Sequence, residues 1–408
     1  MSIPRKKILF FAEPATFAHV ARPVVLASIL DPSQYEVSIA TGADFKSIAI
    51  DTGLPVHDLW CIGSKAYLAA VDAGRVVFSY NILKRYVQED LCLIKAIKPD
   101  IIVGDFRLSL AVSARLMKIP YVGISNAYWS PYAHIDYEIP THPATKLLGV
   151  TAANYTFRLL RPLILAYHSL PMHRLCRKYG MKPLGFDLRQ VFTEADISVF
   201  ADIPEIVPVE KCAIPDRYAF IGPIIWSPKI EVPAELTNQT DNRPLVYISM
   251  GSSGNPGLLS AVVSAVASLN CRIAVATFSD SPAIPSSAKH IVISGLLPGS
   301  EIAAQARLVI CNGGSPTTHQ ALQQGTPVLG IPANMDQLLN MNFIVATGAG
   351  LKVRADQVTH SNIQAAAQRI LNTPDFSKNA QKIAGWFRNY LPEEKFPAIV
   401  NKISSRLY

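Results

Sequence analysis

One stretch decides the fold of this chain: Cys311-Asn312-Gly313-Gly314-Ser315-Pro316-Thr317-Thr318-His319-Gln320-Ala321-Leu322. The residues just before it, 306–310, are mainly apolar and β-branched and predict a buried parallel strand. Ser315 is a favourable N-cap, Pro316 suits the first helical position, and Gly325 predicts the end of a helix. A strand, a Gly-Gly turn and a helix N-terminus in this order direct backbone N–H groups and a helix dipole at one point, which suits a phosphate.

Hydroxyl and glycine residues extend this predicted phosphate site. Thr317 and Thr318 add donors in the first turn of the helix. A second turn, Gly251-Ser252, follows another predicted strand at 245–249 and also suits a diphosphate. The pattern is neither a Walker loop nor a GxGxxG fingerprint.

The same region carries a family resemblance between Pro298 and Asn340. The order Asn-Gly-Gly-x-x-Thr-Thr-x-x-Ala-Leu, then Gly-Thr-Pro-Val-Leu-x-x-Pro, then Asp-Gln-x-x-Asn resembles the donor-binding signature of the UDP-glycosyltransferases. The bacterial branch that glycosylates macrolides and other natural products is the most similar in style. The resemblance implies a donor site made of Gly251, Ser252, Leu296, Asn312, Gly313, Gly314, Ser315, Thr317, Thr318, Gln320, Asp336 and Gln337.

Within that implied site, each part of the donor has its residues. Thr317 and Thr318 would face the diphosphate and Gln320 the ribose, while Leu296 stands where many relatives place an aromatic residue against the base. Asp336 and Gln337 would contact the hydroxyls of the sugar. Asp336 can also be the N-cap of a helix at 337–347, and the two roles can coexist.

Two residues depart from the family pattern. Asn312 stands where the family usually has His, and it can donate a hydrogen bond to a phosphate but carries no positive charge. Gln320 stands where the family usually has Glu, and it offers one acceptor oxygen instead of two. His319, on the same short helix, is expected to be structural.

Bulk properties predict a globular protein of two domains. The chain has 408 residues, of which 50% are hydrophobic and 17% charged. No apolar run reaches the roughly 18 residues of a membrane span. The six cysteines are scattered without a CxxC pair, which predicts a reduced cytoplasmic protein without structural zinc.

Residues 141–182 form a basic, apolar stretch within a net charge of +8. No acidic residue lies between Glu138 and Asp187. Such a stretch can lie on an anionic membrane, which would place the protein peripherally at the inner face. The alternative is a solvated helix pair beside the acceptor site, and both interpretations stay open. No nucleic-acid partner is expected, because no recognised module accompanies the charge.

The N-terminal half alternates predicted strands and helices, as a doubly wound parallel sheet does. The predicted strands are 7–12, 36–40, 101–104 and 121–124, with weaker ones at 191–200 and 219–221, and the helices are 20–30, 108–117 and 141–179. After a polar, Pro-rich passage the pattern restarts with strand 245–249, helix 258–269 and strand 272–277.

These patterns divide the chain into an acceptor domain at 1–228, a linker at 229–242 and a donor domain at 243–380. The resemblance implies the α/β fold called GT-B, in which two Rossmann-like, doubly wound parallel-sheet domains face each other across a cleft. In that fold the last helices, here within 381–408, often cross back to the first domain.

A general base is predicted in the first domain. His19 follows the strand 7–12, and Asp105 ends the strand 101–104, so both fall at carboxyl ends of parallel strands, where ligands bind. A carboxylate that orients His forms a general-base pair, although His19 can be a surface residue and Asp105 a helix cap. Ala18-His19-x-x-x-Pro23 resembles the Gly-His-x-x-Pro element of the family. The segment Pro99–Asp105 resembles the strand of the family that carries the partner Asp.

The resemblance therefore implies an inverting, metal-independent glycosyltransferase without a cofactor, which moves a hexose from a nucleotide sugar, expected to be a UDP-sugar. The acceptor would be a hydroxyl on a lipid, isoprenoid or polyketide-like molecule, with Tyr128, Trp129 and Tyr132 as an aromatic wall of its site, unless these rings pack in the core. Two alternatives stay open: a non-catalytic binding protein and a nucleotide-sugar epimerase of the same architecture.

Overall fold

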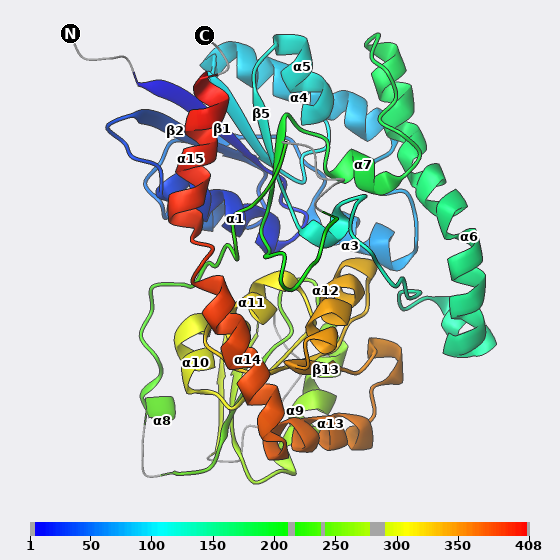
Figure 1. Cartoon of the computed structure of the whole chain (residues 1–408), viewed down its shortest axis with the longest axis vertical. Coiled ribbons are helices and arrows are strands. Elements are labelled where there is room, and N and C mark those ends of the chain that lie inside the picture. The colour runs from blue at the N-terminus through cyan, green and yellow to red at the C-terminus, as the bar shows by residue number, and fades with distance from the viewer. Residues whose placement is uncertain (1–4, 211–216, 238–240, 278–289, 406–408) are drawn as a thin grey trace. The chain divides into compact units, whose positions relative to one another are not determined.

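The computed structural model describes residues 5–210, 217–237, 241–277 and 290–405 (Figure 1). The chain forms two compact units. Unit 1 consists of the residues up to Ile135, Tyr155–Ile224 and the residues from Tyr390 onward, and unit 2 consists of Asp136–Asn154 and Ile225–Asn389. No helix in the described ranges is both long enough and apolar enough to cross a bilayer.

Unit 1 is built on a parallel sheet of seven strands in the order β3-β2-β1-β4-β5-β6-β7. The strands are β1 (Lys6–Ala12), β2 (Tyr35–Thr41), β3 (Val56–Asp58), β4 (Ile101–Asp105), β5 (Tyr121–Ser125), β6 (Ile197–Phe200) and β7 (Tyr218–Phe220). Its helices include α1 (Phe17–Ser28), α2 (Lys46–Ile50), α3 (Ser64–Asp72), α4 (Tyr80–Ile97), α5 (Leu110–Met117), α7 (Leu188–Phe192) and α15 (Pro392–Ser405). Strand order reverses between β1 and β4, and this switch point is the place where such sheets bind ligands.

Unit 2 repeats this plan with six parallel strands in the order β10-β9-β8-β11-β12-β13. The strands are β8 (Leu245–Ser249), β9 (Arg272–Ala276), β10 (Ile291–Ser294), β11 (Leu308–Cys311), β12 (Val328–Gly330) and β13 (Gly350–Lys352). The helices are α8 (Ala234–Thr237), α9 (Leu259–Ala267), α10 (Gly299–Gln305), α11 (Ser315–Gln323), α12 (Met335–Ala346), α13 (His360–Asn372) and α14 (Pro374–Phe387). Its switch point lies between β8 and β11. The prediction of two doubly wound parallel sheets is therefore confirmed.

The strands form because their sequences are continuous apolar runs, as sheets covered on both faces require. All residues of β4, β5, β8 and β11 are buried. In unit 2, Val246, Ile248, Ile310 and Leu329 meet Val262 and Val263 of α9 in one core cluster.

Residues 136–154 were expected in the first domain, but they belong to unit 2. This segment packs on unit 2: the Thr141 amide donates to the Ala333 carbonyl at 2.7 Å, and Arg354 donates to the Ile139 carbonyl at 2.7 Å. The helix α6 (Pro143–Lys178) then leaves unit 2 and continues in unit 1. Its backbone breaks at Gly149, where φ is 74°.

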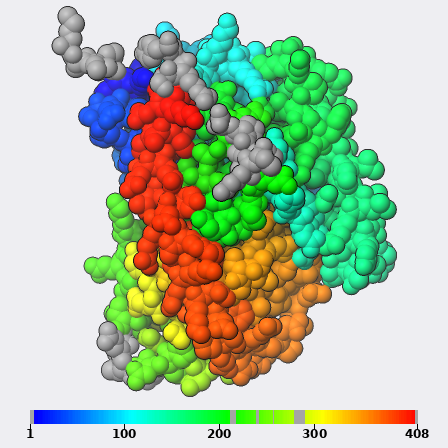
Figure 2. Space-filling model, viewed as in Figure 1, coloured from blue at the N-terminus to red at the C-terminus, as the bar shows by residue number. Residues whose placement is uncertain are grey.

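The last helix, α15, packs on the sheet of unit 1, and the Phe396 and Phe10 ring centroids lie 6.1 Å apart. Its outer side is visible in red in Figure 2. The Tyr35 hydroxyl also donates to Asn401 of this helix.

Two local predictions are wrong. The segment 191–200 is not one strand, because Asp187 caps α7 and only Ile197–Phe200 joins the sheet. The N-cap of α11 is Gly314 and not Ser315, since the Asn312 carboxamide oxygen accepts from the Gly314 amide at 3.0 Å and turns the chain one residue earlier.

Candidate functional site

The structure brings His19 and Asp105 together at the switch point of unit 1. Ala12, the last residue of β1, pairs with Asp105, the last residue of β4, and His19 follows in the first turn of α1. His19 Nδ1 lies 2.8 Å from Asp105 Oδ1. The Asp105 side chain is fully buried, whereas 18% of the His19 side chain is exposed, so the imidazole can be reached from solvent and the carboxylate cannot.

Arg22, one turn after His19 on α1, binds the same carboxylate. Its Nε donates to Asp105 Oδ2 at 2.8 Å, and its Nη2 donates to Asp105 Oδ1 at 2.7 Å. Its Nη1 donates to Asn126 Oδ1 at 2.7 Å, and Asn126 in turn donates to Asp202 at 3.1 Å. This bidentate pair fixes the position of the carboxylate and balances its charge.

The contact with Asp105 favours one tautomer of His19. Arg22 Nη2, which carries two N–H groups, lies 3.0 Å from His19 Nδ1 and also donates to Asp105 Oδ1. If Nδ1 carried no proton, its lone pair would face an Asp105 oxygen at 2.8 Å, which is repulsive. A proton on Nδ1 makes this contact a hydrogen bond and leaves the Nε2 lone pair available as a base.

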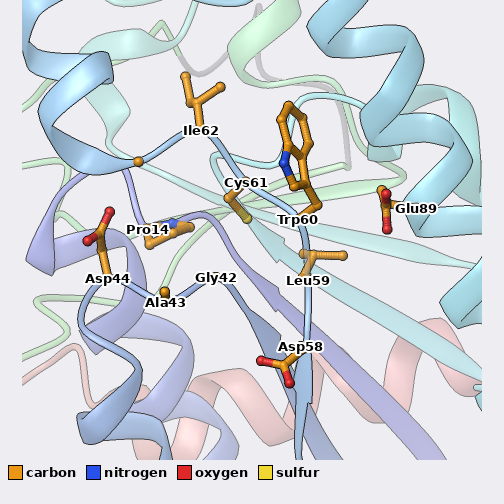
Figure 3. A pocket seen from close by; sticks show the side chains of 11 residues that line it. Pro14, Gly42, Ala43, Asp44, Asp58, Leu59, Trp60, Cys61, Ile62 and Glu89 are labelled. Atoms are coloured by element: carbon orange, nitrogen blue, oxygen red, sulfur yellow. The ribbon is translucent and has the colours of Figure 1, made fainter.

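A pocket of about 440 Å³ lies beside the loop after β1, near the carboxyl ends of β2 and β3 (Figure 3). Pro14, Trp60 and Ile62 line it together with the acidic residues Asp44, Asp58 and Glu89. Its lining contains none of the predicted site residues.

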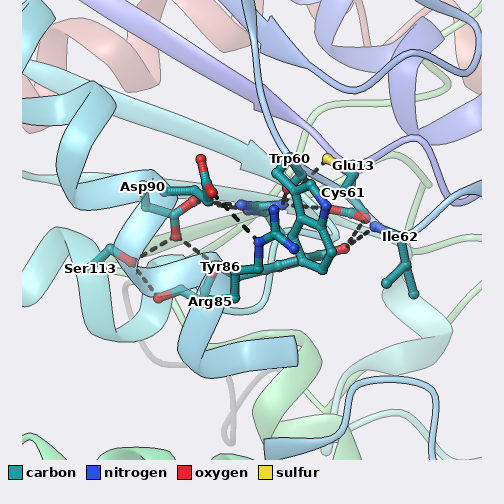
Figure 4. A network of polar contacts seen from close by, with 11 residues as sticks. Glu13, Trp60, Cys61, Ile62, Arg85, Tyr86, Asp90 and Ser113 are labelled. Carbon is teal, nitrogen blue, oxygen red and sulfur yellow. Dashed lines mark hydrogen bonds and ion pairs between the residues drawn. The ribbon is translucent and has the colours of Figure 1, made fainter. Parts of the chain in front are cut away.

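A buried ionic network, part of which is drawn in Figure 4, links Glu13, which follows β1, to Arg107, which follows Asp105. Arg107 donates to Glu13 at 2.9 Å and to Asp90 at 3.0 Å, and all three side chains are fully buried. The Tyr86 hydroxyl donates to Glu13 at 2.6 Å, and its ring lies 3.6 Å from the Arg107 guanidinium carbon. Burial raises the pKa of Glu13 above its ordinary value, although the Arg107 charge opposes this.

Phe106 lies between Asp105 and Arg107 in a left-handed conformation, with φ of 57°. A residue other than glycine adopts this conformation at a cost and keeps it where its neighbours are anchored. Here Arg22 anchors Asp105, and Glu13 and Asp90 anchor Arg107. The Phe106 ring consequently stacks on His19, with centroids 4.5 Å apart and planes 10° from parallel.

From Phe106 an aromatic cluster extends outward. Its ring lies 5.8 Å from Tyr67, 5.6 Å from Phe78 and 5.4 Å from Phe192, and Phe192 lies 5.0 Å from Trp129. We call Tyr67, Phe78, Phe106, Trp129 and Phe192 the aromatic cluster. It offers ring faces and edges next to the candidate base, which suits a flat apolar group.

The three predicted acceptor residues are placed differently. Trp129 belongs to the aromatic cluster and is partly exposed. Tyr128 is fully buried, so its ring packs in the core of unit 1. Tyr132 packs against Tyr218, with centroids 5.8 Å apart, and does not contact the cluster through any of the ring pairs described.

In unit 2 the two predicted phosphate turns meet at the switch point. Ser249 and Cys311 are register partners at the ends of β8 and β11. Asn312 donates to the Ser253 hydroxyl at 3.1 Å and so ties the two turns together. Gly251 and Gly313 have φ of 62° and 83°, and a Cβ on Gly313 would lie 2.6 Å from Met341. At Gly313, therefore, only glycine fits without strain.

The two threonines of the signature differ in their surroundings. Thr318 is fully buried, and its hydroxyl donates to the Gly314 or Ser315 carbonyl and accepts from Asn340 at 2.9 Å. Asn340 also donates to the Gly313 carbonyl at 2.8 Å. Thr318 therefore holds the turn, whereas Thr317 is partly exposed in the first turn of α11.

Gln320 and Gln337 are also engaged within unit 2. Gln320 donates to the Trp226 carbonyl at 2.7 Å. Gln337 is 1% exposed; its carboxamide oxygen accepts from the amide of Asn334, the N-cap of α12, and from the Ala333 amide, and its nitrogen donates to the Ser253 carbonyl at 3.3 Å. Gln337 thus holds the turn that contains Ser253, whereas Gln320 holds the backbone at Trp226.

Three predicted donor residues lie near the surface, whereas Ser315 is buried at the start of α11. Asp336 lies in the first turn of α12, and Asn334 is the N-cap, so the interpretation of Asp336 as the cap is wrong. Leu296 is 38% exposed after β10, and Ser252 is partly exposed beside Gly251. His319 is buried against Phe387, at 5.7 Å between ring centroids, as expected of a structural residue.

Sequence reasoning missed Arg22, Phe106, Arg107, Asn126, Ser253 and Phe192. A buried arginine among apolar residues has no periodic signal. For Arg22 the one available clue was its position three residues after His19, on the same face of a helix.

The chain has known relatives along nearly its whole length. A family model described as "Erythromycin biosynthesis protein CIII-like, C-terminal domain" matches residues 260–396. A PGL/p-HBAD biosynthesis glycosyltransferase of Mycobacterium tuberculosis (strain ATCC 25177 / H37Ra) is 40% identical over 94% of this chain and 89% of its own. A PGL/p-HBAD biosynthesis rhamnosyltransferase of Mycobacterium bovis (strain BCG / Pasteur 1173P2) is 37% identical over 94% and 84%.

Among solved structures, the spinosyn rhamnosyltransferase SpnG complexed with thymidine diphosphate has the same fold. The TM-score is 0.67 at 19% identity, over 98% of this chain and 99% of that one.

Proposed function

Because the chain belongs to the family of the PGL/p-HBAD biosynthesis glycosyltransferases and is a glycosyltransferase of the GT-B type, we propose that it transfers a hexose, with inversion, from a nucleotide sugar to a hydroxyl of an apolar acceptor. The observation that carries the proposal is the buried Asp105 carboxylate on His19 Nδ1. It leaves Nε2 as a general base next to an aromatic cluster that can hold the acceptor.

In the proposed reaction His19 Nε2 takes the proton of the acceptor hydroxyl. The acceptor oxygen forms a bond to the anomeric carbon, while the bond from that carbon to the diphosphate oxygen breaks. Asp105 stabilises the imidazolium that results. Backbone amides at the start of α11 and the Thr317 hydroxyl would stabilise the departing diphosphate.

Unit 2 would supply the donor site. We assign the diphosphate to the Gly251-Ser252 and Gly313-Gly314 turns, and the hydroxyls of the sugar to Asp336. Thr318 and Gln337 would act indirectly, by holding these turns in place, and Gln320 remains assigned to the ribose. The family resemblance favours uridine diphosphate, and the thymidine diphosphate bound to SpnG brings a second pyrimidine nucleotide into consideration.

The acceptor would bind in unit 1 through Trp129 and the other members of the aromatic cluster. The five cysteines described are free thiols, which supports a reducing, cytoplasmic setting in which nucleotide sugars are available.

A screen of nucleotide sugars tests the donor assignment. A ligand that binds the folded state raises the melting temperature. We expect a UDP- or TDP-hexose, including the rhamnosyl donor, to raise it more than the free nucleotide does. The protecting donor should then support transfer to an alkylated phenol or alcohol.

A second candidate is a binding protein of the same fold without activity. The engagement of Asn312 favours it, because this side chain donates to Ser253 and accepts from the Gly314 amide, so both of its polar groups are used within unit 2. No stabilisation by any nucleotide sugar and no transfer would support this second candidate.

A further inference from the structure

One face of α6 presents large apolar side chains to solvent. Tyr155, Leu159, Leu163, Tyr167 and Leu170, here called the α6 row, are 74%, 80%, 70%, 61% and 39% exposed. They are spaced by four, four, four and three residues, so they lie along one side of the helix. In Figure 2 this segment, in green, lies at the surface of unit 1.

The buried side of α6 already accounts for its place in unit 1. Met172, Leu175 and Cys176 are buried in a core cluster with Leu83 and Tyr86 of α4. The α6 row contributes nothing to that core. Single exposed leucines are common, but a continuous row of this kind marks a surface that binds something apolar.

Basic residues lie farther along the same side of the helix. Arg174 and Arg177 follow Leu170 at spacings of four and three and are exposed, and Lys178 is exposed beside them. No acidic residue occurs anywhere between Glu138 and Asp187. The surface therefore requires a partner that is apolar at one end of the row and anionic at the other.

We propose that the α6 row and its continuation through Arg174, Arg177 and Lys178 bind the surface of an anionic phospholipid bilayer. The apolar side chains would enter the boundary between headgroups and acyl chains, and the cations would contact the phosphates. A second copy of this chain fits less well, because the row offers apolar and cationic groups and no anion to pair with the arginines. The inference is independent of the proposed transfer reaction.

Vesicle co-sedimentation of the full chain tests this inference. We expect binding to phosphatidylcholine vesicles that contain about one third phosphatidylglycerol, and much weaker binding to phosphatidylcholine alone. The double variant Arg174→Gln/Arg177→Gln should bind the anionic vesicles roughly thirtyfold less tightly, the loss expected for two cations near an anionic surface. Leu159→Gln/Leu163→Gln should bind neither vesicle.

Matched controls keep the test specific. Ile50→Gln removes an apolar side chain that is 56% exposed on another helix, and Lys65→Gln/Lys95→Gln removes two exposed cations elsewhere in unit 1. Both controls should bind like the wild type. The proposal is overturned if the wild type does not bind anionic vesicles, or if the controls lose as much affinity as the α6 variants. A wild type that dimerises through the row in light scattering and ignores vesicles would equally overturn it.

Discussion

At the scale of single residues, Arg22 positions the carboxylate that orients the candidate base. Its guanidinium donates to both Asp105 oxygens and balances the charge of this buried carboxylate. Asp105 in turn lies 2.8 Å from His19 Nδ1. We therefore interpret Arg22 as a positioning residue that acts on His19 through Asp105.

Replacement of Arg22 tests this interpretation. In Arg22→Gln the carboxylate loses its bidentate cationic partner, so Asp105 should hold the imidazole less firmly and kcat should fall at least tenfold, with the donor Kd unchanged. Arg22→Lys keeps a cation at this position and should restore part of the lost kcat. Circular dichroism checks the fold of each variant. A kcat equal to that of the wild type in folded Arg22→Gln would contradict the role.

Other side chains could be placed from the sequence only where a strand or helix pattern gives their position. His19 and Asp105 could be predicted because each ends or follows a recognisable buried strand. The burial of Tyr128 and Thr318 could not, since neighbouring aromatic or hydroxyl residues such as Trp129 and Thr317 carry the same local pattern. Which of two adjacent side chains faces solvent is decided by packing.

At the scale of elements, the loop after β4 gives the site its shape. The network of Arg107, Glu13 and Asp90 joins this loop to the loop after β1 and to α4. The loop thereby keeps Phe106 left-handed and stacked on His19. Most strands could be predicted from their apolar runs, but this loop could not, because its conformation depends on ion pairs between distant segments.

Removal of the central cation should disturb both stability and activity. Arg107→Met leaves Glu13 and Asp90 buried without their partner, which should cost about 3–5 kcal/mol of unfolding free energy. It should also lower transfer while leaving nucleotide affinity unchanged. Arg85→Met is the matched control, because Arg85 stacks on Trp60 at 3.7 Å but its side chain is about half exposed. Chemical denaturation and calorimetry measure both quantities, and equal losses in the two variants would refute the assignment.

At the scale of the whole molecule, residues 136–154 belong to unit 2 although they lie within the N-terminal half of the chain. Local periodicity predicts a helix near 141–179 correctly, but it does not say which sheet the helix packs against. The attachment depends on Asp356, which accepts from Thr145 Oγ1 at 2.8 Å and from Arg354 Nη2 at 2.8 Å.

The contribution of Asp356 to the free energy of unfolding should depend on pH. Burial raises the pKa of Asp356, but the hydrogen bonds from Arg354 and Thr145 outweigh it, so the pKa lies below its ordinary value of 3.8. A lowered pKa stabilises the folded state above that value, and the contribution is lost as the pH falls through the folded pKa. Asp356→Asn should therefore cost about 1–2 kcal/mol at pH 7 and clearly less at pH 2.5.

Urea denaturation at the two pH values measures this difference. Asp375→Asn is the control, because Asp375 forms an exposed pair with Lys378 and should matter little at either pH. A constant cost for Asp356→Asn at both pH values would contradict the linkage.

We propose that His19 is the base and that separate residues of unit 2 hold the donor. The most direct test measures donor affinity by calorimetry and the transfer rate in His19→Ala with the donor found by the thermal screen. We predict a donor Kd close to that of the wild type and a transfer rate lower by about two to four orders of magnitude. Transfer at a rate near that of the wild type in correctly folded His19→Ala would contradict the account.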